Sequence, residues 1–193
     1  MAITVLVVDD SAFMRQLIKQ MLESDPEINV VAVATDGVDA LNKIDFFRPQ
    51  VVTLDLEMPR MDGLTMLAEL MRRNPLPVVV VSSIAVEGGE HTLQALELGA
   101  VDFVTKPVAM PSQELWQIQD ELVLKVKAAA EVRPELIEEL PVAEPVPEQA
   151  FDDVPSTGIV VVGASTGGPR ALRYLLSQIP PDFPWGMIIA QHI

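Results

Sequence analysis

The sequence predicts an α/β fold in which a five-stranded, doubly wound parallel sheet carries helices on both faces. Two observations lead to this class. Short apolar runs alternate with helical patterns five times, and polar residues that carry chemistry follow the ends of these runs. Because the carboxyl ends of parallel strands meet at one edge of an open α/β sheet, we expect these polar residues to lie together there.

The expected elements follow one another without interruption as far as residue 130. Ser11 is a suitable N-cap for the first helix, and Gly88 and Gly89 predict a loop before the fourth helix. The apolar faces of the helices recur at a spacing of three to four residues. The expected strands are 3–8, 28–34, 51–54, 78–81 and a short one around 103–104, and the expected helices are 11–21, 37–44, 64–73, 92–98 and 112–130.

Five polar residues stand at the predicted strand ends. Asp9 and Asp10 follow the first strand, and Asp55 follows the third. Ser82 follows the fourth strand, and Lys106 follows the fifth. Carboxylates that are crowded together repel one another and require a divalent cation, while a nearby lysine offers a positive charge to a phosphate. This combination is the chemistry of an aspartate that accepts a phosphoryl group.

Residues 1 to about 125 resemble the receiver domain of response regulators. The resemblance implies a flavodoxin-like sheet and phosphorylation of Asp55 by a histidine kinase in the presence of Mg²⁺. The motifs that carry it are Val7–Ser11 (VVDDS), Leu54–Pro59 (LDLEMP), Met61–Gly63 (MDG), Val81–Ser83 (VSS) and Thr105–Pro107 (TKP).

The same resemblance implies roles for single residues. Mg²⁺ is expected on Asp10, Asp55 and the backbone carbonyl of Glu57, with Asp9 acting through water. Few oxygen ligands suit Mg²⁺, which keeps several of its waters.

Three further residues are expected to respond to the phosphoryl group. Lys106 would pair with one phosphoryl oxygen and Ser82 would donate its hydroxyl to another. Ser83 is the alternative to Ser82 if the strand ends one residue later. Phe103 matches the switch aromatic of the family, and its alternative role is core packing.

A linker is expected over residues 126–156. Acidic residues and prolines dominate it from residue 131 onward, a composition that favours an extended, self-repelling spacer, with a recognition segment for a partner as the alternative. The acidic residues are Glu131, Glu135, Glu138, Glu139, Glu144, Glu148, Asp152 and Asp153, against Arg133 as the base.

The composition also excludes several classes of protein. A net charge of −15 argues against nonspecific binding of nucleic acid. The chain has no cysteine, no apolar run long enough to span a membrane, and no basic leader at its start. We therefore expect a cytoplasmic protein that is not inserted in a membrane.

A second α/β unit is expected to begin at residue 157. Strands at 158–162 and 186–190 flank a helix at 170–177, and Gly163–Gly167 (GASTG) fits the pattern G-x-S-x-G between the first strand and the helix. Such a turn exposes Ser165 Oγ near the N–H groups of a helix N-terminus. His192, which follows the next strand, could serve as its base. A phosphate-binding loop and a plain strand–helix turn remain alternatives.

In the context of a receiver and an acidic linker, this turn resembles that of the chemotaxis protein-glutamate methylesterases. The resemblance implies a hydrolase domain in which Ser165 is the nucleophile and His192 the base. N–H groups at the Gly167–Gly168 turn would help to hold the oxyanion. The implied substrate is a methylated chemoreceptor, with deamidation of glutamine as a second activity.

This chain departs from that family in one respect. The family's catalytic domain runs further and contributes its triad aspartate late in the sequence, whereas this chain ends at Ile193. We therefore expect the N-terminal part of a longer methylesterase, without esterase activity of its own. The alternatives are a receiver that only signals and binds, and a nucleotide-binding domain that begins at residue 157.

Overall fold

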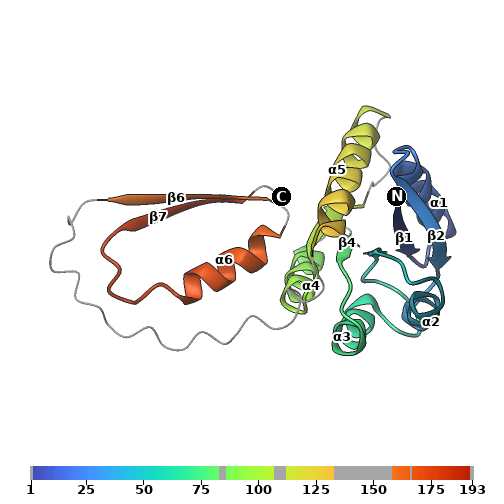
Figure 1. Ribbon diagram of the computed structural model, residues 1–193, viewed down its shortest axis with the longest axis horizontal. Helices are drawn as coiled ribbons and strands as arrows, with labels where there is room; N and C mark the ends of the chain where they lie inside the picture. Colours follow the sequence, from blue (N-terminus) through green and yellow to red (C-terminus); the bar gives the residue numbers. More distant parts are fainter. Residues whose placement is uncertain (1, 83–85, 107–111, 133–157, 166, 192–193) are drawn as a thin grey trace. The chain divides into compact units, whose positions relative to one another are not determined.

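The computed structural model describes residues 2–82, 86–106, 112–132, 158–165 and 167–191. These residues belong to two compact units, Met1–Glu138 and Glu139–Ile193. Strands and helices alternate through both units (Figure 1). The elements of the first unit are β1 (Ile3–Val8), α1 (Ala12–Glu23), β2 (Ile28–Ala34), α2 (Gly37–Phe47), β3 (Val51–Leu54), α3 (Gly63–Arg73), β4 (Val78–Ser82), α4 (Val86–Glu97), β5 (Asp102–Thr105) and α5 (Ser112–Ala130).

The first unit is built on a sheet with the strand order β2-β1-β3-β4-β5. All neighbouring strands are parallel; for example, Val7 pairs with Thr53 and Val80 with Phe103. The order changes direction between β1 and β3, which is the switch point where open α/β sheets of this type hold their ligands. The predicted five-stranded, doubly wound, flavodoxin-like fold is confirmed.

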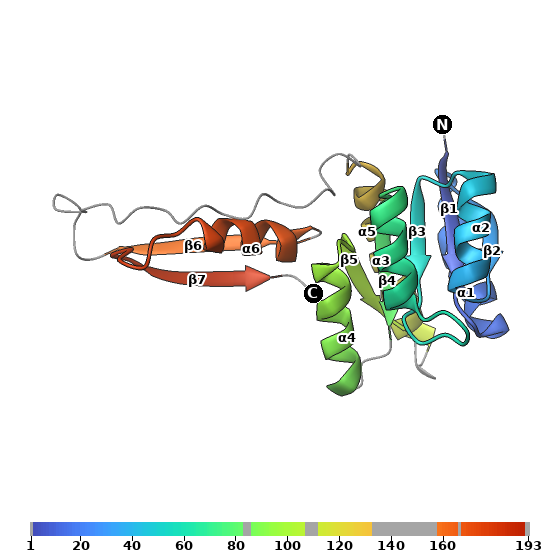
Figure 2. The ribbon, with the colours of Figure 1, turned by 90° about the horizontal axis from the view of Figure 1, so that it is seen from below.

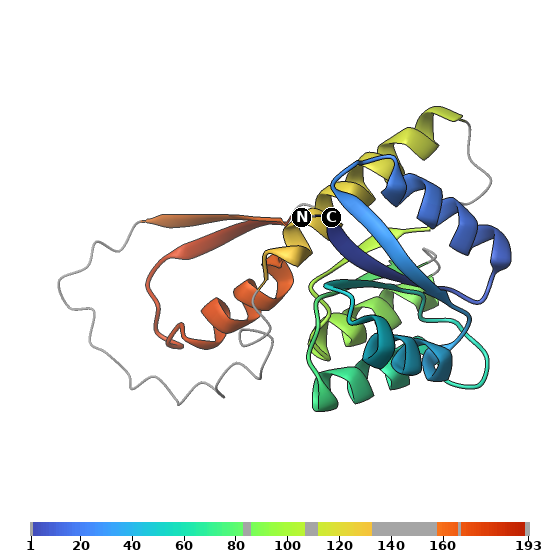
Figure 3. The same ribbon diagram turned by 45° about the vertical axis from the view of Figure 1, so that its right-hand side comes forward.

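Helices cover both faces of this sheet. Helices α1 and α5 lie on one face, and α2, α3 and α4 lie on the other (Figures 2 and 3). Side chains alternate along β1, so that Val5 and Val7 pack towards α1 and α5 while Leu6 and Val8 pack towards α2 and α3. A strand that is buried on both faces is apolar along its whole length, which explains the unbroken runs in the sequence.

The predicted loop at Gly88 and Gly89 is wrong. Helix α4 already begins at Val86 and includes both glycines. Glycine costs a helix about 1 kcal/mol per residue relative to alanine, but extending a helix that already exists costs far less than starting one. The buried residues Thr92 and Ala95 lie in the later turns of α4 and pack them against the first unit, which stabilises the helix as a whole.

Several element ends differ from the predictions by a few residues. Helix α2 runs to Phe47, α3 begins at Gly63, and β4 includes Ser82. The part of the predicted linker from residue 133 to 156 lies outside the described residues. Among those that are described, no helix has the length and apolar character to cross a bilayer.

The second unit contains β6 (Ile159–Ala164), α6 (Gly168–Ser177) and β7 (Gly186–Gln191). The two strands are parallel, with Val161 opposite Ile188, and α6 contacts β6. The strand–turn–helix–strand order predicted from residue 157 is therefore present. Apolar side chains on both strands and on α6 remain exposed, including Ile159, Val161, Ile188, Tyr174 and Leu176.

Candidate functional site

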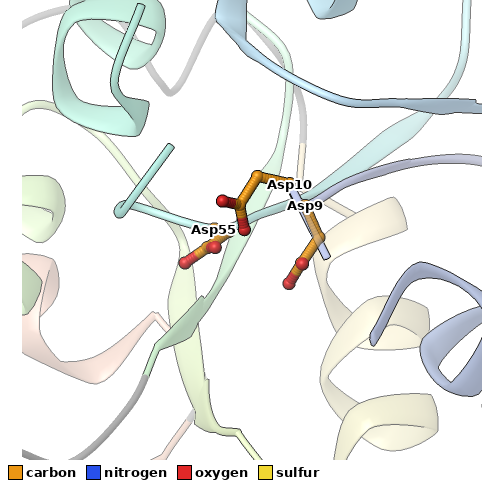
Figure 4. A group of neighbouring side chains, drawn as sticks. All are labelled: Asp9, Asp10 and Asp55. Atoms are coloured by element: carbon orange, nitrogen blue, oxygen red, sulfur yellow. The ribbon is translucent and has the colours of Figure 1, made fainter. Parts of the chain in front are cut away.

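Asp9 and Asp55 lie side by side at the carboxyl edge of the first sheet (Figure 4). Both carboxylates are buried. Local backbone contacts fix them, because the Ser11 N–H donates to Asp9 Oδ1 at 2.8 Å and the Glu57 N–H donates to Asp55 Oδ1 at 3.2 Å. Each aspartate therefore presents its second oxygen, Oδ2, to the shared edge.

Lys106, which follows β5, brings its ammonium to both Oδ2 atoms. Its Nζ lies 2.6 Å from Asp55 Oδ2 and 3.1 Å from Asp9 Oδ2. The backbone N–H of Lys106 donates to the Ser82 carbonyl at 2.7 Å, which fixes Lys106 beside the end of β4. The structure thus brings together Asp9, Asp55, Ser82 and Lys106 from four neighbouring strand ends, as the sequence predicts.

Burial and charge act in opposite directions on these groups. Burial raises the pKa of Asp55 above its ordinary value, and the Asp9 charge adds to this, while the hydrogen bond and charge of Lys106 partly offset it. Burial alone would lower the pKa of Lys106. The hydrogen bond and charge of Asp55, together with Asp9, outweigh burial and raise it, so that the lysine stays charged at neutral pH.

Asp10 completes a group that has the chemistry of a divalent-cation site. One carboxylate oxygen of each of Asp9, Asp10 and Asp55 lies within 4.8 Å of the others, and Asp10 is exposed to solvent (Figure 4). Hard oxygen ligands with access to water suit Mg²⁺. The Oδ2 atoms of Asp9 and Asp55 are buried, and among the described residues their partner is the Lys106 ammonium, so that each oxygen keeps a lone pair for an ion. The donor set therefore fits Mg²⁺.

The remaining predicted residues have different positions. Glu57 is exposed two residues after Asp55, and Ser82 is the buried last residue of β4. Phe103 is half-buried on β5, and its ring faces Lys125. Ser83, the alternative to Ser82, lies outside the described residues.

Two residues that support the site were not predicted. Arg15 Nη1 donates to the carbonyls of Asp9 at 2.7 Å and Asp10 at 2.9 Å, and so fixes the loop after β1. At Gly63, a Cβ atom would lie 2.2 Å from the Asp55 carbonyl oxygen, and so α3 can begin here only with glycine. The Asp62-Gly63 pair was a visible signal for this close approach, whereas Arg15 carries no local signal.

Ser165 follows β6 at the start of α6 and is exposed. Its carbonyl accepts hydrogen bonds from the Gly168 N–H at 2.7 Å and from Gln191 Nε2 at 3.1 Å. Gly167 adopts a left-handed conformation with φ 76°, which favours glycine at the N-cap of α6. Gln191, at the end of β7, was not singled out from the sequence. His192 lies outside the described residues, so that its position relative to Ser165 stays a prediction.

Comparison with known families identifies the first unit. The profile described as the response regulator receiver domain matches residues 5–117. The chain belongs to the response regulator family. This response regulator also matches the CheB methylesterase profile over residues 160–193. The predicted combination of a receiver with the start of a methylesterase domain is therefore confirmed.

Individual relatives agree with these profiles. The response regulator is 48% identical over 197 residues to a protein-glutamate methylesterase/protein-glutamine glutaminase of Halalkalibacterium halodurans, covering 99% of this chain and 55% of that one. It is 48% identical over 204 residues to the protein of the same description from Symbiobacterium thermophilum, with 99% and 56% covered. The chain thus spans about half the length of the curated relatives it matches.

A solved structure supports the fold of the first unit. The response regulator domain of Thermotoga maritima CheB is 43% identical, with a TM-score of 0.63, and the match covers 69% of this chain and all of that domain.

Proposed function

We propose that this response regulator accepts a phosphoryl group on Asp55 and thereby controls a serine hydrolase that begins at residue 157. The hydrolase would remove methyl esters from glutamates of chemoreceptors and deamidate glutamines, the two activities named for its relatives. The contact that carries the proposal is the Lys106 ammonium between the buried carboxylates of Asp9 and Asp55. A cation fixed beside an aspartate at a sheet edge is suited to hold a phosphoryl group there.

Mg²⁺ is the expected cofactor. Asp10, Asp55 and the backbone carbonyl of Glu57 would hold it, and Asp9 would act through a bound water. When bound, the ion neutralises negative charge on the phosphoryl group as it transfers in line.

The protein's own groups perform the remaining steps. A carboxylate oxygen of Asp55 forms the bond to phosphorus as the bond to the histidine nitrogen of a kinase donor breaks. Lys106 then pairs with a phosphoryl oxygen in place of Asp55 Oδ2, and the Ser82 hydroxyl donates to another oxygen. Because the Lys106 N–H is bonded to the Ser82 carbonyl, the two residues would shift together.

In the hydrolase, Ser165 would attack the ester carbonyl, and His192 would take its proton and return it to the departing methanol. N–H groups at the Gly167–Gly168 turn would help to hold the oxyanion, and the Gly168 N–H donates to the Ser165 carbonyl in this structure. Gln191 holds the same carbonyl and would orient the turn.

The proposal includes an organisation of the chain. The receiver would comprise residues 1–125, the linker 126–156 and the start of the catalytic domain 157–193, although α5 itself continues to Ala130. The partners would be a histidine kinase and a methylated chemoreceptor in the cytoplasm. In the complete protein, phosphorylation would open the catalytic domain to substrate, provided that the phosphorylated receiver prefers an undocked arrangement.

Phosphodonor labelling tests the assignment of Asp55. With Mg²⁺ present, the parent chain should become labelled and Asp55→Asn should not, because an amide cannot accept the phosphoryl group. Asp45→Asn, which changes an exposed aspartate on α2, is the matched control and should label like the parent. Undiminished labelling of Asp55→Asn would exclude Asp55.

The hydrolase is tested in a protein that carries the whole catalytic domain. Ser165→Ala should remove methanol release from methylated receptor while leaving phosphorylation of Asp55 intact. Esterase activity retained by that variant would rule out Ser165 as the nucleophile.

A further inference from the structure

A buried lysine lies on α5 and is not part of the phosphorylation site. Lys125 Nζ donates to the Phe103 carbonyl at 2.6 Å and forms ion pairs with Asp102 at 3.3 Å and with Glu121 at 2.7 Å. It also lies 5.2 Å from the centre of the Phe103 ring, within the range of a cation–π contact. A buried ammonium is costly unless it is paired, and these contacts offset that cost.

The contacts of Lys125 are directed at one short segment of β5. This strand is an edge of the sheet, and among the described residues no strand pairs with the backbone groups on its open side. At Phe103 the Lys125 ammonium binds the carbonyl, while Asp102 Oδ1 accepts the Phe103 N–H at 2.7 Å. Because Asp102 also pairs with Lys125, both polar backbone groups of Phe103 are linked to α5, the carbonyl directly and the N–H through Asp102.

The segment of β5 at Asp102 and Phe103 leads directly into the phosphorylation site. Phe103 stands three residues before Lys106, whose ammonium lies 2.6 Å from Asp55. A shift of Lys106 towards a phosphoryl oxygen would therefore also displace β5, to which Lys125 is bonded at the Phe103 carbonyl. At the other side of the contact, α5 is the last element described before the second unit.

We propose that Lys125 is a positioning residue that couples the movement of β5 on phosphorylation to α5. The inference rests on the proposed phosphorylation of Asp55. It assigns the buried ion pair with Asp102 a role in transmitting the signal, in addition to closing the edge of the sheet. If closing the edge were its only role, removing it would weaken the fold and leave the response of α5 to phosphorylation unchanged.

Nuclear magnetic resonance of the 193-residue chain separates these roles. Beryllofluoride with Mg²⁺ serves as a stable stand-in for the phosphoryl group, and backbone amide shifts are compared with and without it. In the parent, amides near Asp55 and Lys106 and amides of α5 from residue 118 to 130 should shift. In Lys125→Met the shifts near Asp55 should persist, while those of α5 should fall at least about threefold.

Two further variants complete the experiment. Lys127→Met is the matched control, because Lys127 ties the same helix to Asp25 and Glu27 rather than to β5, and its α5 shifts should equal those of the parent. Because Lys125→Met leaves Asp102 buried without its cation, Lys125→Met/Asp102→Asn removes both charges and should give the same loss with a smaller cost to folding.

Each outcome bears on a separate claim. Parent-like α5 shifts in Lys125→Met, or in the double variant if the single one does not fold, would overturn the coupling. The same holds if the Lys127→Met control loses the α5 response equally. A parent that responds near Asp55 but not in α5 would overturn the coupling and leave the phosphorylation site in place. A parent that binds no beryllofluoride would overturn both.

Discussion

Strands β1 and β6 have similar apolar sequences and different surroundings. In β1 the residues from Val5 to Val8 are at most 1% exposed, whereas in β6 Ile159 is 67% and Val161 70% exposed. The first strand lies inside a five-stranded sheet with helices on both faces, and the second pairs only with β7 among the described residues. An apolar run thus defines a strand locally, while its burial depends on elements distant in the sequence.

The two units also begin their helices differently. Helices α1, α2 and α3 have the caps Ser11, Asp36 and Asp62, whose side chains accept N–H groups of the first turn. Helix α6 has Gly167 at the N-cap and no side-chain cap. The receiver helices are therefore specified by local contacts as well as by packing, and the start of α6 is shaped by the Ser165 turn.

Equivalent glycine substitutions should give the largest difference between the units. Gly63→Ala places a Cβ against the backbone of Asp55 and Leu56, which cannot move aside like a side chain, and should destabilise the receiver by about 3 kcal/mol. Gly163→Ala meets no atom within 4 Å and should change stability by no more than about 0.5 kcal/mol. Urea unfolding followed by circular dichroism measures both. Equal costs would mean that α3 does not pack against Asp55 as described.

Truncation of an apolar side chain should give the next largest difference. Leu6→Ala removes a fully buried side chain from β1 and should cost about 2–5 kcal/mol, since it leaves a cavity. Ile159→Ala changes a side chain on β6 that is largely exposed and should cost less than about 0.5 kcal/mol. The same unfolding measurement applies. A large cost at Ile159 would show that β6 is covered in solution.

Acid should weaken the receiver through its cap on α2. Hydrogen bonds from the backbone, that of Asp39 foremost, and the contact with Arg60 lower the pKa of Asp36 below its ordinary value of 3.8. A carboxyl with a lowered pKa in the folded state stabilises that state above the ordinary value, and the contribution is lost as the pH falls through the lowered one. Urea midpoints at about pH 6 and about pH 3 should therefore differ less in Asp36→Asn than in the parent. An unchanged difference would exclude Asp36 as a source of the acid sensitivity.

The sequence was sufficient to predict what depends on local pattern. The strands and the gathering of Asp9, Asp55 and Lys106 at one edge follow from apolar runs and from the geometry of parallel sheets. Helix α4 was predicted too short, because packing of its later turns on the sheet outweighed the preference of Gly88 and Gly89 for a loop.

Contacts between residues distant in the chain could not be predicted from the sequence. In the sequence, Lys125 is indistinguishable from an ordinary exposed helical lysine. Its burial depends on β5 lying beside α5, where Lys125 contacts Phe103, a residue 22 positions earlier in the chain. Arg15 was likewise missed, because a side chain that binds backbone carbonyls leaves no pattern. Asp62-Gly63 was noticed as a motif, and its steric meaning required the position of the Asp55 carbonyl.

The most direct test of the account is to locate the phosphoryl group by mass spectrometry after the chain has reacted with a phosphodonor and Mg²⁺. The account predicts one phosphoryl group, on Asp55, and none in the second unit. It also predicts that no labelling occurs when Mg²⁺ is chelated before the donor is added. A phosphoryl group on another residue, or labelling that does not require a divalent cation, would contradict the site formed by Asp9, Asp10, Asp55 and Lys106.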